Sequence, residues 1–163
     1  MIERDYIMRM ITMLTAVIAR LVQLKEARDY PRALAELQQQ CRSLLGVDAE
    51  FLCSFEPASL SHLFGSDPQA AAIKCFAAGV LLKERSEVLA LLEQPDDAAA
   101  DRAQALNLLL EAYQSAGDHI DARHADLIEQ LAGSIASPDD ALHQRLLAYQ
   151  ESLPARELPS DEP

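Results

Sequence analysis

Residues 1–31 read MIERDYIMRMITMLTAVIARLVQLKEARDYP, and they indicate a long helix that is apolar around more than half of its circumference. The apolar residues recur at steps of three and four, which is the spacing of one face of an α-helix. We predict a helix over residues 2–27 that ends before Pro31, because proline is tolerated in a helix only at its first turn. The row that faces the core would be Ile2, Tyr6, Met10, Met13, Val17, Leu21 and Leu24.

A second apolar row lies beside the first and requires a second packing partner, which is either a later helix of the chain or a second copy of it. If four of its side chains were fully buried between two copies, the gross gain would be roughly 12–24 kcal/mol. Association consumes roughly 4–15 kcal/mol of such a gain. We therefore expect a homodimer with an isologous interface, and the candidates for partner binding are Ile7, Ile11, Leu14 and Ile18.

All four methionines, Met1, Met8, Met10 and Met13, lie within the first thirteen residues. Methionine is flexible and polarisable, which suits adaptable binding surfaces. The alternative interpretation is that this helix is the central core helix of the monomer.

The rest of the chain predicts an all-α fold. Ala (27) and Leu (26) make up 53 of 163 residues, and there are only five Gly; both common residues are strong helix formers. We expect one all-α domain over residues 1–153 and a disordered acidic tail over residues 154–163. The further helices are predicted over residues 31–45, 57–65, 68–93 with a break near 83–86, 98–116, from a turn at Gly117 and Asp118 to about 131, and 138–153 with Ser137 as cap.

Three segments have a similar turn-like pattern: residues 29–33, 84–88 and 118–122. The last two are 34 residues apart, and the first is 34 residues plus an insertion of 21 from the second. The spacing, together with Leu109, Tyr113, Gly117, Asp118 and Ala122, resembles tetratricopeptide repeats, which are arrays of antiparallel helical hairpins. In the first segment Arg28 stands where that repeat usually has glycine.

Residues 5–11, DYIMRMI, and residues 44–48, LLGVD, also resemble an uncharacterised bacterial family that begins with a DYIMRxI helix. The resemblance implies a helical-hairpin fold and no particular chemistry.

Charge and cysteine content narrow the function classes. Residues 61–163 carry a net charge of −11 out of −12 for the chain, so binding to nucleic acid is not expected. Glu3, Asp5 and Arg9 interrupt the apolar N-terminal residues, which argues against a signal peptide or a membrane span. Three cysteines without CxxC spacing, Cys41, Cys53 and Cys75, predict buried thiols in a cytoplasmic protein, with neither a disulfide framework nor a zinc site.

Two carboxylate–histidine pairs are the residues most suited to chemistry. Asp121 with His124, and Asp140 with His143, each lie three residues apart on one helix face and could contribute to a metal site. The other interpretation is that the acidic residues cap helix starts and the histidines lie at the surface. We expect no catalytic residue and no cofactor. The prediction is a non-enzymatic, self-associating protein–protein interaction module with an unidentified partner, and the alternative is a metal-binding protein or metal-dependent enzyme.

Overall fold

A computed structural model describes residues 2–116 and 122–153, and over these residues the chain forms eight helices and no strand. The prediction of an all-α fold is confirmed. The helices are α1 (Ile2–Glu26), α2 (Tyr30–Leu45), α3 (Ala49–Ser54), α4 (Pro57–Phe64), α5 (Pro68–Leu91), α6 (Pro95–Ala116), α7 (Ala122–Ser134) and α8 (Asp140–Ser152).

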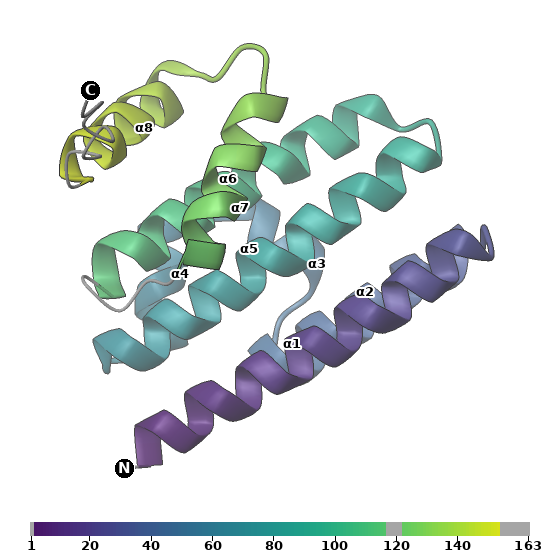
Figure 1. Cartoon of the computed structure of the whole chain (residues 1–163), viewed down its shortest axis with the longest axis horizontal. Coiled ribbons are helices and arrows are strands. Elements are labelled where there is room, and N and C mark those ends of the chain that lie inside the picture. Colours follow the sequence, from purple (N-terminus) through teal and green to yellow (C-terminus); the bar gives the residue numbers. More distant parts are fainter. Residues whose placement is uncertain (1, 117–121, 154–163) are drawn as a thin grey trace, which may run out of the picture.

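Helices α5 and α6 form the antiparallel hairpin at the centre of the fold, and they share more contact than any other pair of helices (Figure 1). Gly79 allows this close approach. A Cβ atom at residue 79 would lie 2.9 Å from Cγ of Leu109 and 3.1 Å from the carbonyl oxygen of Ala105. The two backbones are therefore closer at this point than any larger residue would permit.

The hairpin of α1 and α2 packs along one side of α5, with α1 on the outside (Figure 1). Arg28 adopts a left-handed conformation (φ 56°), and the N–H of Asp29 donates to the carbonyl of Leu24 over 2.9 Å. This is a Schellman-type helix end, where glycine is the favoured residue. The predicted turn before Pro31 is confirmed.

The predicted break near residues 83–86 is wrong, because α5 continues from Pro68 to Leu91 without interruption. The charged residues in this segment pair with one another and with α1, so they do not need a loop to reach water. The segment 84–88, aligned above with the other two turns, therefore lies inside a helix, and the repeat alignment is wrong there. Gly117 and Asp118 lie outside the described residues, as does the predicted tail.

Most other helix ends follow their predicted signals. Gly46 ends α2 in a left-handed conformation (φ 74°), and Asp67 accepts a hydrogen bond from the N–H of Gln69 at the start of α5. The start of α8 differs from the prediction. Its cap is Asp139, which accepts from the N–H of Leu142 over 2.8 Å, and not Ser137.

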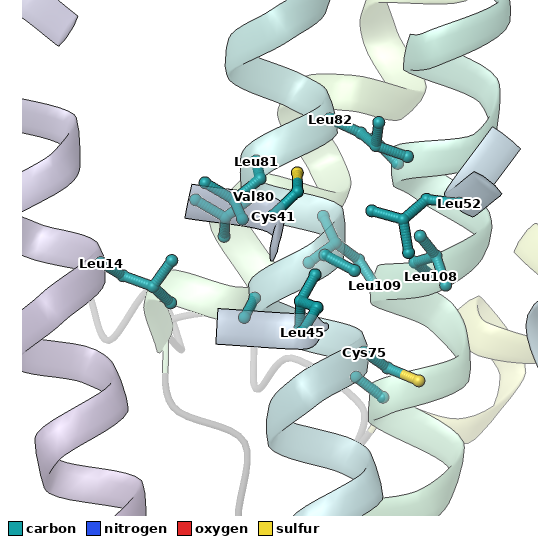
Figure 2. Close-up of a cluster of buried hydrophobic side chains, with 14 of the residues drawn as sticks. Leu14, Cys41, Leu45, Leu52, Cys75, Val80, Leu81, Leu82, Leu108 and Leu109 are labelled. Carbon is teal, nitrogen blue, oxygen red and sulfur yellow. The ribbon is translucent and has the colours of Figure 1, made fainter. Parts of the chain in front are cut away.

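One apolar core joins the two hairpins. Figure 2 shows side chains from five helices meeting in it: Leu14, Cys41, Leu45, Leu52, Cys75, Val80, Leu81, Leu82, Leu108 and Leu109. Cys41 and Cys75 are buried as predicted, whereas the prediction for Cys53 is wrong because this thiol is exposed.

Candidate partner-binding surface on helix α1

A strip of five residues on α1 faces away from the core. We call it the outer strip; it consists of Met8, Ile11, Thr15, Ile18 and Val22. Met8 is 56% exposed and Val22 is 43% exposed. Thr15 is exposed as well, while Ile11 and Ile18 are half-buried. The strip therefore presents apolar side chains that the monomer covers only in part.

The outer strip differs from the predicted row by a rotation of the helix. Leu14, predicted to bind a partner, is 3% exposed and points into the core in Figure 2. Met13, predicted to be in the core, is 38% exposed. The physical reason is that Leu14 lies four residues after Met10 and three before Val17, so it shares their face of the helix. Ile7, the remaining predicted candidate, is half-buried.

Nothing in the outer strip opposes removal from water. None of its five residues is charged. The hydroxyl of Thr15 donates to the carbonyl of Ile11 over 2.9 Å, and that of the adjacent Thr12 donates to the carbonyl of Met8 over 2.9 Å. Each threonine therefore has its hydroxyl satisfied within the helix, so burying it would not leave an unpaired polar group.

An ion-pair network fixes the C-terminal end of α1 against α5. Nζ of Lys25 lies 3.2 Å from Oε2 of Glu84 and 2.8 Å from Oε2 of Glu87, and Nζ of Lys83 lies 3.1 Å from Oε1 of Glu87. Burial acts to lower the pKa of Lys25, but the hydrogen bond to Glu87 and the two carboxylate charges outweigh it and raise that pKa. Burial acts to raise the pKa of Glu87, but Lys25 and Lys83 outweigh it and lower that pKa. The network holds the rotation of α1 that leaves the outer strip outside.

Within the described part of the chain, α1 is the one helix long and apolar enough to cross a membrane by length and composition. An 18-residue window within residues 5–26 has a mean hydropathy of 1.6, and 28% of that window is buried. The sequence analysis had regarded this helix as a poor membrane span. Buried core helices and signal sequences share the same length and composition, so this property alone does not assign a location.

A second polar cluster lies where α3 meets α5 and α6. Asp101 is 4% exposed; its Oδ1 accepts from the thiol of Cys53 over 3.2 Å, and its Oδ2 lies 3.5 Å from Nε of Arg85. Burial raises the pKa of Asp101, and burial together with the Asp101 carboxylate raises the pKa of Cys53 to about 12. A thiol in this state is protonated at neutral pH and is a weak nucleophile. The cluster therefore fits a structural role, tying α3 to the central hairpin.

The candidate metal residues do not meet in the described part of the chain. His124 is buried, which corrects the expectation that it lies at the surface: its Nε2–H donates to the carbonyl of Leu109 over 2.8 Å, and its ring packs on Phe76 with centroids 4.9 Å apart. Asp140 and His143 are exposed on α8, and Asp121 lies outside the described residues. Among the residues that the structure describes, no group of three or more His, Cys, Asp or Glu could hold a metal ion.

Sequence reasoning missed Met8 and Thr15 as members of the exposed strip, although a signal for them exists. The steps from Met8 through Ile11, Thr15 and Ile18 to Val22 are three, four, three and four, the spacing of a coiled-coil seam. Thr15 had been counted as polar, so this pattern was not followed. Comparisons with models of protein families, with curated proteins and with solved structures find no match to the chain.

Proposed function

We propose that this protein is a non-enzymatic protein–protein interaction module that associates with a second copy of itself through the outer strip of α1. The observation that carries the proposal is the exposure of Met8 (56%) and Val22 (43%) on a 25-residue helix that is otherwise packed in the core. Such a strip, free of charge and with its hydroxyls satisfied, loses little when it leaves water.

Charge supports a second copy as the partner at this edge. Helix α1 carries four basic and three acidic residues, a net of +1, in a chain of net charge −12. Two copies repel each other least where this edge of one meets the same edge of the other. The same acidity opposes nucleic acid and anionic membranes, which we propose are not partners.

The proposal extends to the architecture and the compartment. Helical-hairpin arrays present long helix faces to protein partners, and the first hairpin has a left-handed residue, Arg28, at the position where the tetratricopeptide repeat has glycine. We propose that the α1–α2 hairpin is a repeat-like unit with an exposed face and that the protein acts in the cytoplasm, consistent with its free thiols.

The exposures set the expected strength of association. Full burial of a Met or Val side chain is worth roughly 1.5–3 kcal/mol. Met8 and Val22 each retain about half of that, so two copies together gain roughly 3–6 kcal/mol from these residues, and the half-buried isoleucines add less. This gain only approaches the 4–15 kcal/mol that association consumes. We therefore expect a weak dimer with a dissociation constant on the order of 100 µM.

The test replaces Met8 with Glu and measures sedimentation velocity over a concentration series that brackets the expected dissociation constant. The variant should keep its helix content, because Met8 is exposed, and should dimerise at least about tenfold more weakly, equivalent to about 1.4 kcal/mol. The matched control is Ala16→Glu, which introduces the same charge at an exposed position of α1 away from the strip and should dimerise like the wild type.

A wild-type protein that stays monomeric throughout this range would contradict the proposal. Equal weakening by both variants would show that general charge, and not the outer strip, controls association. Sedimentation of the wild-type monomer with phosphatidylcholine vesicles, abolished by Met8→Glu, would assign the strip to a membrane surface instead.

A further inference from the structure

We propose that the two copies pair their α1 helices antiparallel, crossing at Thr15, so that Met8 of each chain meets Val22 of the other. This inference rests on the proposed function and adds the orientation and register of the partner.

The spacing of the strip supports direct packing of one helix on another. Steps of three and four alternate from Met8 to Val22 over two heptads, which keeps one seam facing a partner helix along its length. Side chains at such a seam insert between those of the facing helix. Since α1 rises about 1.5 Å per residue, the seam is about 21 Å long.

The register follows from the symmetry of the strip. Met8 and Val22 each lie seven residues from Thr15, and Ile11 and Ile18 lie four and three residues from it. A two-fold axis at Thr15 places the longest and most flexible side chain of the strip opposite the small, stiff Val22 at both ends. The smallest side chain of the strip, Thr15, then meets its own copy where the helices come closest.

Charge favours the antiparallel orientation over the parallel one. Glu26 is exposed at the C-terminal end of α1, on the same side of the helix as Met8 because the two are 18 residues, five turns, apart. Parallel pairing would place Glu26 against Glu26 of the other copy. Antiparallel pairing places it beside the N-terminus of the other α1, where the helix dipole is positive.

Cysteine cross-linking tests the register directly. In a background with Cys53→Ser, the remaining native thiols, Cys41 and Cys75, are buried. Three single variants are then made: Met8→Cys, Thr15→Cys and Val22→Cys. Diamide serves as the oxidant that accepts the two hydrogens when a disulfide forms, and the disulfide requires Cα atoms within about 7 Å.

The expected result is that Thr15→Cys cross-links with itself, and that Met8→Cys cross-links with Val22→Cys only when the two variants are mixed. Efficient self-cross-linking of Met8→Cys would establish a parallel pair and overturn the inference. Dimers in sedimentation without either expected cross-link would also overturn it while leaving the proposed function intact. A wild-type monomer would contradict both.

Discussion

Replacing Gly79 with Ala tests how closely α5 and α6 pack. The change favours the helix itself by up to about 1 kcal/mol, because glycine is a poor helix former. It also places a methyl group 2.9 Å from Cγ of Leu109 and 3.1 Å from the carbonyl oxygen of Ala105. Leu109 is fully buried, and a backbone carbonyl cannot rotate away, so neither neighbour gives way easily.

Overpacking of this kind typically destabilises a core by about 1–3 kcal/mol. The clash therefore exceeds the propensity gain, and we expect the free energy of unfolding to fall by about 1–2 kcal/mol. For a chain of this size the melting temperature should fall by about 2–4 °C per kcal/mol. Urea unfolding followed by far-UV circular dichroism measures the change.

The matched control is Gly133→Ala in α7, where an added Cβ meets nothing within 4 Å. The same substitution there should stabilise the protein by up to about 1 kcal/mol, since only the helix propensity changes. If Gly79→Ala were as stable as the control, the central hairpin would have room that the structure does not show, and the argument from close approach would be refuted.

Two further predictions concern buried polar groups. His124→Ala should lower the free energy of unfolding by about 1–3 kcal/mol, because the buried carbonyl of Leu109 loses its donor, whereas His143→Ala on the exposed face of α8 should change it by less than about 0.5 kcal/mol; equal effects in urea unfolding would contradict the burial of His124. Lys25→Met should lower stability by roughly 1–3 kcal/mol. The raised pKa of Lys25 keeps its contribution present below 10.5, and the lowered pKa of Glu87 keeps its contribution present above 4.5. The difference from wild type should therefore be flat from about pH 6 to 10, and a steep slope in that window would refute the network.

The sequence predicted the helix ends well because their signals are local. Pro31, Pro57 and Pro68 each lie at the first or second residue of a helix, and Gly46 follows the end of one. Each residue acts through its own backbone geometry, so no knowledge of the tertiary structure is required.

The sequence did not predict the continuity of α5 or the burial of its charged residues, because these depend on distant partners. Glu84 is paired with Lys25, 59 residues away, and Asp101 with Cys53, 48 residues away. Before those partners are known, a charged segment within a helix is equally consistent with a break. The absence of Gly or Pro at residues 83–86 was the better local signal.

The same long-range pairing explains where the outer strip ends. The next position in its spacing of three and four is Lys25, three residues after Val22, so a longer seam would have to include it. Lys25 turns instead toward Glu84 and Glu87 on α5, because a lysine placed in an apolar seam would lose its hydration without a counter-charge. The residue that fixes the rotation of α1 therefore also limits the exposed seam to two heptads. A seam this short buries less than the roughly 800 Å² per partner of a stable interface, which is why we expect self-association to depend on concentration.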